Sequence, residues 1–180
     1  GNTVVFKAAQ LVPASAHSLT EIIVKSGIPD GVFNLVIGKG TQVGDTIVNH
    51  LKINAVSFTG SVPTGRKVAA SAVARMAKVQ LEMGGKNPLI VLDDADLDKA
   101  VDCAIQGAFY STGQRCTASS RLIVTDGIHN KFIDGMIARM KDLVVDHALK
   151  KETTIGPVVD KRQLQQDLEY LDIGKSEGAV

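Results

Sequence analysis

The feature that most constrains the fold of this chain is a regular alternation of short apolar runs with longer amphipathic segments. Strand-like runs are found at 3–6, 32–38, 55–58 and 78–83, and a segment with helical spacing of apolar residues follows each of the first three. Such an alternation is typical of βαβ units, whose right-handed crossovers produce parallel strands. We therefore expect an α/β fold in which helices cover both sides of a parallel sheet.

The stretch "EMGGKNP", residues 82–88, interrupts this rhythm with two glycines and a proline. Alternation then resumes with a strand at 89–92, a helix capped by Asp96, a strand at 121–125 and further helices. We place a domain boundary at the break, so that residues 1–83 form one domain and residues 84–180 form a second.

Composition excludes several classes of function. A net charge of +1 gives no basic surface for nucleic acid, and no apolar run is long enough to span a membrane. Two cysteines and no visible signal peptide suggest a reducing, cytoplasmic compartment. The four histidines are isolated, and the run "DDADLD" lacks the spacing of a calcium loop, so we expect no metal site.

Glycines gather where predicted strands end. Gly38 and Gly40 follow the second strand, and Gly60 and Gly65 surround the turn after the third. Ligands of parallel sheets bind at the carboxyl ends of the strands, and a helix that begins there offers backbone N–H groups to a pyrophosphate. Neither stretch is a G-x-G-x-x-G fingerprint or a P-loop, and tight turns explain the glycines equally well.

The two cysteines have different surroundings. Cys103 lies near the apolar stripe of a predicted helix, and we expect it in the core. Cys116 follows a helix stop in "STGQRCTASSR", where small polar residues surround it. If a helical turn begins at Cys116, its free N–H groups would favour a thiolate. A reactive thiol and a small residue after a turn both remain open at this point.

Two charged residues stand at predicted strand ends. Glu82 ends an otherwise buried strand, where partial desolvation would suit a general base. The alternative is a structural ion pair of Glu82 with Lys78 or Lys86. Lys7 ends the first strand, and its local sequence indicates only a solvated lysine.

Taken together and in order, several stretches resemble the NAD(P)-dependent aldehyde dehydrogenase superfamily. They are "GNTVVFKAAQ", "GIPDGVFNLVIGKG", "VSFTGSVPTG", "LEMGGKNPLIVLDDADLDKAV" and "GQRCTASSR". The resemblance runs nearly the whole chain, and "FYSTGQRCTASSRLIVTDGI" is similar to the 2-oxoglutarate semialdehyde (2,5-dioxopentanoate) dehydrogenases. It implies a Rossmann-like NAD(P)-binding portion at 1–83 and the start of an α/β catalytic domain at 84–180.

The resemblance also implies roles for individual residues. Cys116 is implied to be the nucleophile that attacks the aldehyde, and its backbone N–H is implied to hold the oxyanion. Hydride would pass to NAD or NADP and leave a thioester, and Glu82 would activate the water that hydrolyses it. The cofactor contacts that the resemblance implies are Lys7, Gln10, Gly40, Gly44, Phe58, Thr59, Gly60, Ser61, Gly65, Met83 and Gly84.

Two departures from the family pattern matter. The usual Lys-Pro-x-Glu motif is "KAAQ" here, and Gln10 removes a carboxylate that would repel a 2′-phosphate, so we expect NADP to be tolerated beside NAD. Family residues that complete the oxyanion site, the nicotinamide site and the dimer interface lie outside this sequence. We therefore expect these 180 residues alone to be inactive, and a homodimer or homotetramer for the full-length protein.

Two other functions remain open from the sequence. One is a dinucleotide-binding module in which Cys116 is inert. The other is an aldehyde dehydrogenase that passes the acyl group to CoA, although Glu82 argues against it because transfer to a thiol needs no base for water. The substrate is expected to be an acid-semialdehyde. Arg115 beside the nucleophile attracts its carboxylate, or else it points outward or pairs with a neighbouring acid.

Overall fold

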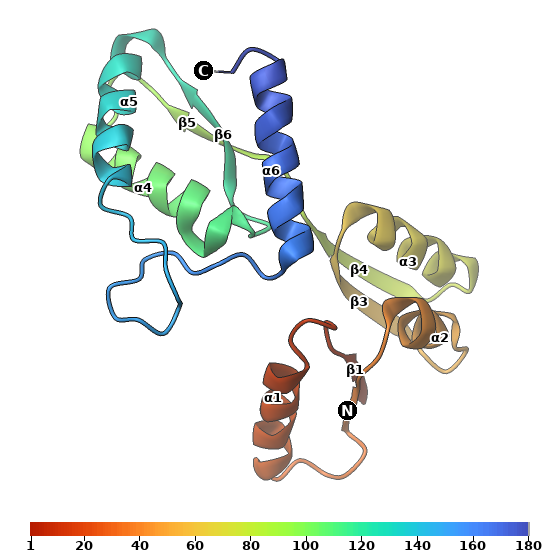
Figure 1. Ribbon diagram of the computed structural model, residues 1–180. Coiled ribbons are helices and arrows are strands. Elements are labelled where there is room, and N and C mark those ends of the chain that lie inside the picture. The colour runs from red at the N-terminus through yellow and green to blue at the C-terminus, as the bar shows by residue number, and fades with distance from the viewer. Residues whose placement is uncertain (180) are drawn as a thin grey trace. The chain divides into compact units, whose positions relative to one another are not determined.

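The computed structural model describes residues 1–179 and divides the chain into two compact units, Gly1–Met83 and Gly84–Val180 (Figure 1). Their division coincides with the glycine pair after Glu82. Within the units the strands pair as three βαβ motifs, each with its own helical crossover. The assignment of the two units to cofactor binding and catalysis stays a prediction.

The first unit contains two of these motifs. Strand β1 pairs in parallel with β2, and β3 pairs in parallel with β4. Helix α1 packs against β2, while α3 packs against both β3 and β4. The bounds of the elements are β1 Val4–Lys7, α1 Pro13–Lys25, β2 Phe33–Val36, the π-helical turn η1 Gly40–Gly44, α2 Asp45–Asn49, β3 Ala55–Gly60, α3 Val62–Ala74 and β4 Lys78–Met83.

The second unit contains the third motif and two further helices. Strand β5 pairs in parallel with β6, and α4 and α5 lie side by side against this pair (Figure 1). A short 3₁₀ turn, η2, separates α4 from the loop that carries Cys116. The bounds are β5 Asn87–Val91, α4 Leu97–Phe109, η2 Tyr110–Gly113, β6 Ser119–Val124, α5 Asp126–Met140 and α6 Lys161–Ser176.

The α/β class and the parallel direction of the strands are confirmed, but the expected continuous sheet is not. Within residues 1–179 the six strands form three separate two-stranded pairs. Each pair is closed by the helix that connects its own two strands, so pairing is local to each βαβ motif. The short strands consequently each keep one edge free of strand partners in the described part of the chain.

The core of the second unit lies where α4 and α5 cover the strand pair. Phe132 of α5 is 2% exposed, and Val101 and Ala104 of α4 are buried against it in one cluster. Asp96 caps α4 as expected, because its carboxylate accepts a hydrogen bond from the Lys99 N–H at 3.2 Å. Packing of the buried face of α4 fixes the end of this helix, and with it the start of the loop that carries Cys116.

Cys103 is a correction to the sequence analysis, because its side chain is exposed rather than in the core. It lies on the same helix as the buried residues Val101, Ala104 and Ile105, but the helical rotation of about 100° per residue turns it off their stripe. Instead it lines a shallow pocket of about 300 Å³ beside Leu89 of β5. A cysteine close to an apolar stripe in sequence is therefore not a core residue here.

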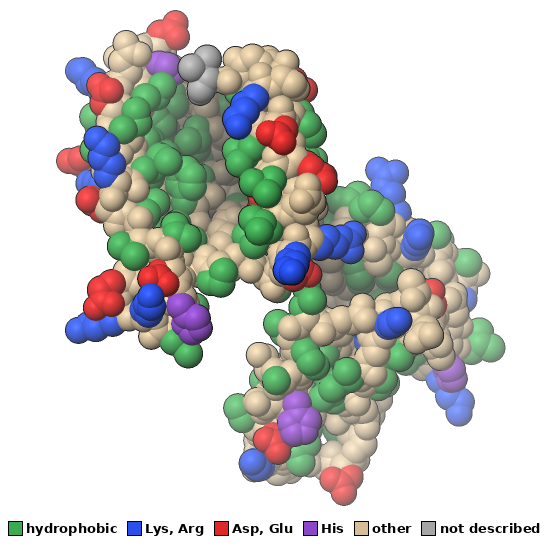
Figure 2. Space-filling view, viewed as in Figure 1, with side chains coloured by type: hydrophobic (Ala, Val, Ile, Leu, Met, Phe, Trp, Pro, Cys, Tyr) green, Lys and Arg blue, Asp and Glu red, His purple; other side chains and the backbone are tan. Residues whose placement is uncertain are grey.

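Helix α6 carries an exposed apolar row. Leu164, Leu168 and Leu171 recur at helical spacing, as the sequence predicts, yet they are 48%, 47% and 61% exposed. Figure 2 shows hydrophobic side chains at the surface over this part of the molecule. No helix within residues 1–179 is both long and apolar enough to cross a lipid bilayer.

Candidate active site

Cys116 lies in an exposed turn that connects α4 to β6. Residues 115–118 form this turn, which closes with a hydrogen bond of 3.0 Å from the Ala118 N–H to the Arg115 carbonyl. No helix begins at Cys116, so the helix-terminus effect considered in the sequence analysis is absent. Among the described residues, the N–H groups of Cys116 and Thr117 donate to no protein acceptor. The turn thus presents a thiol beside two available backbone donors.

The chain reaches this turn through a left-handed segment. Ser111 and Thr112 both have φ of 55°, and Gly113 has φ of 67°. Two consecutive non-glycine residues in this region cost about 1–2 kcal/mol each. At Gly113 a side chain would also approach the Ala108 carbonyl at 2.7 Å, so glycine is required there on two counts. Strain of this kind is commonly found at functional sites.

Two side chains anchor the turn. The Asn87 amide Nδ2 donates to the carbonyl oxygens of Cys116 at 2.7 Å and of Ala118 at 3.3 Å. The Arg115 guanidinium donates to the carbonyls of Gln106 at 2.5 Å and of Gly107 at 3.2 Å, at the end of α4. Arg115 is therefore exposed, and one nitrogen of its guanidinium is engaged with backbone carbonyls at the end of α4.

Glu82 lies near the carboxyl end of β4, opposite Thr59 of β3. Its side chain is exposed, which corrects the expectation of partial desolvation. The strand alternates between half-buried and exposed positions, and Glu82 falls on the exposed face with Gln80, whose amide reaches Oε1 at 3.5 Å. None of the ion pairs among the described residues joins Glu82 to Lys78. The carboxylate is thus accessible to solvent and to a ligand.

The residues predicted around the phosphate turn do gather in space within the first unit. A Cβ on Gly60 would lie 2.6 Å from the Phe58 ring, and a Cβ on Gly65 would overlap the Met83 sulfur. Gly65 is buried at the second turn of α3. Glycine at both positions lets the backbone, Phe58 and Met83 approach each other closely.

The turn itself leads directly into α3. Ser61 is the N-cap residue of that helix, and its hydroxyl donates to Thr64 Oγ1 at 2.9 Å rather than capping a backbone N–H. The Ser61 side chain therefore does not cap the free backbone N–H groups in the first turn of α3. Thr59 is exposed directly before the turn, and Gly84, which begins the second unit, has no atom of the chain within 4 Å of a Cβ position.

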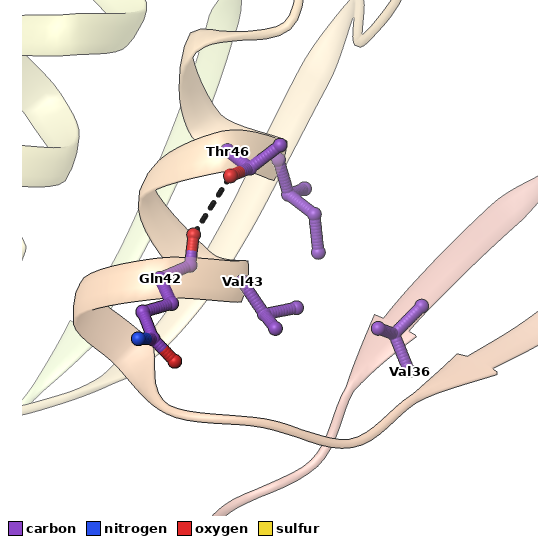
Figure 3. A pocket seen from close by; sticks show the side chains of 5 residues that line it. Val36, Gln42, Val43 and Thr46 are labelled. Carbon is purple, nitrogen blue, oxygen red and sulfur yellow. Dashed lines mark hydrogen bonds between the residues drawn. The ribbon is translucent and has the colours of Figure 1, made fainter.

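A second glycine pair borders an apolar pocket. Gly40 and Gly44 are the first and last residues of the π-helical turn η1, and a Cβ on either would meet open space. Gln42 and Val43, which lie between the two glycines, line a pocket of about 370 Å³ between β2 and the η1–α2 segment (Figure 3). The Thr46 hydroxyl donates to the Gln42 carbonyl at 2.8 Å and ties the turn to α2. The pocket is lined by Val36, Gln42, Val43, Thr46 and Ile47.

Lys7 is the last residue of β1, and Gln10 follows it three positions later. Lys7 is half-buried rather than fully solvated, and its Nζ donates to the Ala8 carbonyl at 2.8 Å. Gln10 is exposed in the turn that precedes α1. Both residues thus lie near the carboxyl end of β1. The hydrogen bond of Lys7 to the neighbouring Ala8 carbonyl uses one N–H of its ammonium group and leaves the other two available.

Among residues 1–179, no group of three or more His, Cys, Asp or Glu side chains has the arrangement of a metal site. The residue that sequence reasoning missed is Asn87. No local signal marks it, because its hydrogen-bond partner Cys116 lies 29 residues further along the chain. Only the parallel pairing of β5 with β6 places it beside the cysteine turn.

The fold and these residues define a class: an α/β protein with two glycine-rich turns at strand ends and an exposed cysteine in a separate, anchored turn. Residues 1–180 match the aldehyde dehydrogenase family, and the chain belongs to that family. The Bacillus subtilis alpha-ketoglutaric semialdehyde dehydrogenase is 47% identical over 179 residues, which are 99% of this chain and 37% of that protein. The chain therefore spans about 37% of the length of this relative.

Solved structures agree with this membership. An NADP-dependent enzyme from E. coli superimposes with a TM-score of 0.95 at 37% identity, over 98% of this chain and 37% of that one. Betaine aldehyde dehydrogenase from Staphylococcus aureus, solved in complex with NAD+, gives a TM-score of 0.93 at 35% identity, over 98% of this chain and 35% of that one. The resemblance inferred from the sequence motifs is thereby confirmed at the level of the family.

Proposed function

We propose that the protein carrying this chain oxidises an acid-semialdehyde to a carboxylate with NAD or NADP, and that Cys116 is the nucleophile. The observation that carries the proposal is the Cys116 turn, which exposes the thiol and leaves the N–H groups of Cys116 and Thr117 without acceptors among residues 1–179. Backbone donors aimed at a developing oxyanion are a large contribution to catalysis of acyl chemistry. Family membership supports the same reaction class.

Each residue then has a defined task. The Cys116 thiolate forms a bond to the aldehyde carbon, and the carbonyl oxygen becomes an oxyanion held by backbone N–H groups. When bound, the cofactor supplies the acceptor for the hydride that leaves this carbon, so that a thioester to Cys116 remains. Glu82 takes a proton from water, the resulting hydroxide attacks the thioester, and the carboxylate product leaves as Cys116 recovers its thiolate.

The cofactor fits residues of the first unit. Ser61 does not cap α3 with its side chain, so backbone N–H groups at the start of the helix lack a side-chain acceptor from it, which suits a pyrophosphate. The open backbone of Gly40 and Gly44 beside an apolar pocket suits the nucleoside end. Lys7 and Gln10 would contribute the remaining polar contacts.

Two variants of the full-length protein test the roles of Cys116 and Glu82. We expect Cys116→Ser to abolish aldehyde-dependent NADH formation, and Glu82→Gln to leave a single burst of NADH while steady turnover is lost. Unchanged steady turnover of Glu82→Gln would show that Glu82 is not the base.

Thiol labelling provides an independent measurement. Since both Cys103 and Cys116 are exposed, faster alkylation of Cys116 by iodoacetamide at neutral pH would report reactivity rather than access. Equal rates at the two cysteines would favour an inert thiol and a binding module.

The cofactor preference rests on Gln10. Because its amide carries no charge to repel a 2′-phosphate, we expect kcat/KM with NADP to lie within about a hundredfold of that with NAD, a difference of about 2.7 kcal/mol. Replacing Gln10 with Glu should shift the ratio towards NAD. A wild-type preference for NAD beyond that range would contradict the proposal.

A further inference from the structure

Asn87 occupies a fixed position at the start of β5. Its backbone is in register with Ser119 of β6, and the register shifts between Asn87 and Pro88. The residue before a proline is restricted to extended conformations, so the Asn87 backbone is constrained from both sides. The Arg121 guanidinium donates to the preceding carbonyl, that of Lys86, at 2.8 Å and adds a further restraint.

Both N–H bonds of the Asn87 amide are used on the cysteine turn. They point to the carbonyls of Cys116 at 2.7 Å and of Ala118 at 3.3 Å, which lie on either side of Thr117. A carboxamide nitrogen has two donors, so this side chain is saturated by the turn. The half-buried Asn87 therefore acts as a two-point clamp on the backbone that carries Cys116.

The clamp determines where neighbouring donors point. A peptide group is planar, so fixing the Cys116 carbonyl towards Asn87 turns the Thr117 N–H in the opposite direction. This N–H donates to no acceptor among the residues that the structure describes. The same bond restrains the dihedral angle between the Cys116 Cα and its carbonyl carbon, and with it the backbone from which the thiol projects.

We propose that Asn87 is a positioning residue, which holds the peptide between Cys116 and Thr117 in the orientation needed for attack on the aldehyde. The inference rests on the proposed function of Cys116 and deepens it. Loss of the clamp should lower the rate of the chemical step, because a well-oriented nucleophile and donor contribute through geometry. It should leave cofactor binding unchanged, since Asn87 is not among the residues that the resemblance assigns to the cofactor.

The chain offers a matched control in Asn34. Its amide Nδ2 also donates to two backbone carbonyls, those of Gly31 at 2.8 Å and of Val4 at 3.1 Å, but in the first unit. Asn34→Ala removes the same pair of side-chain donors from β2, at a position without a proposed role. A merely structural contribution should therefore affect the two alanine variants alike.

The test compares Asn87→Ala, the isosteric Asn87→Asp and Asn34→Ala in the full-length protein, with 2-oxoglutarate semialdehyde and NAD as probes. Both Asn87 variants should lose at least about tenfold in kcat, with KM for NAD within about twofold of wild type. Asn34→Ala should keep kcat within about twofold. Circular dichroism establishes folding, and the aspartate variant decides if the alanine variant does not fold.

Equal kcat values for the Asn87 variants and Asn34→Ala would overturn the inference, as would a rise in KM for NAD with kcat unchanged. Cys116→Ser, assayed in parallel, separates the two levels of the argument. If Cys116→Ser is inactive while the Asn87 variants are normal, the clamp is refuted and the nucleophile stands. If Cys116→Ser retains turnover, the proposed function fails, and the clamp inference fails with it.

Discussion

Replacing Gly107 with alanine tests how closely α4 packs against β6, just after the cysteine turn. A Cβ at Gly107 would lie 2.5 Å from Ser119 Oγ and 3.2 Å from Ser119 Cβ. The Ser119 backbone cannot retreat easily, because it is in register with Asn87 in the strand pair. The new methyl group must therefore displace the hydroxyl or push the helix away from the strand.

Two opposing terms set the magnitude. Alanine in place of glycine inside a helix stabilises by about 1 kcal/mol, whereas overpacking costs about 1–3 kcal/mol. We expect Gly107→Ala to lower the free energy of unfolding by about 1 kcal/mol. Ser119→Ala should be nearly neutral by itself, and it removes the hydroxyl that the Gly107 Cβ would meet at 2.5 Å. The double variant should recover the loss, with a coupling energy of about 1–2 kcal/mol.

Urea denaturation of the full-length protein, followed by circular dichroism, measures these differences as shifts in the unfolding midpoint. Gly174→Ala in α6 is the matched control, because its Cβ would meet nothing closer than the Ala179 Cβ at 3.8 Å and should only add stability. If Gly107→Ala stabilises as Gly174→Ala does, α4 and β6 are not in the close contact described here. The same conclusion follows if Ser119→Ala fails to rescue it.

Three further predictions follow from the structure. Phe132→Ala should lower the free energy of unfolding by about 3–5 kcal/mol, because it empties a buried site, while exposed Ile133→Ala should change it by less than about 1 kcal/mol. Arg75→Ala should cost about 2–3 kcal/mol in the same measurement, since its guanidinium bonds two backbone carbonyls near α2. The pKa of the Asp146 carboxyl is lowered by a hydrogen bond from the Lys150 ammonium and by one from the His147 backbone N–H. The small stabilising contribution of Asp146 is therefore present above the unfolded pKa, and it is lost as pH falls through the folded pKa. Lys150→Met should raise the Asp146 midpoint in an NMR titration, and an unchanged midpoint would contradict that assignment.

Local pattern predicted most of the fold. The apolar runs and the Asp96 cap predicted β4 and the start of α4 as observed, and the strand expected at 89–92 overlaps β5. Periodicity and capping are properties of neighbouring residues, so local sequence is sufficient to predict them. The pairing of the strands could not be predicted from local sequence in the same way. Which strands become neighbours depends on contacts between distant segments, so one sheet was expected where three pairs are found.

The site was predictable in part. The residues of the glycine turns lie where their motif suggests, since tight turns leave a local signature in glycine positions. The surroundings of single side chains were not, because exposure is decided by the face of an element that tertiary packing covers. Cys103 and Glu82 are both exposed for this reason. Asn87 escaped notice because its partners are 29 and 31 residues away.

The left-handed pair Ser111 and Thr112 has a practical consequence for anyone who engineers a hardier version of this protein. Glycine or asparagine at these positions would relax the backbone, and each change would look attractive in a stability screen. The segment leads directly into the cysteine turn. A more relaxed backbone at Ser111 and Thr112 is therefore expected to make the position of the Cys116 thiol less fixed. Substitutions at these two residues are expected to raise thermal stability and to lower the catalytic rate. Stabilising substitutions are better placed elsewhere in the chain.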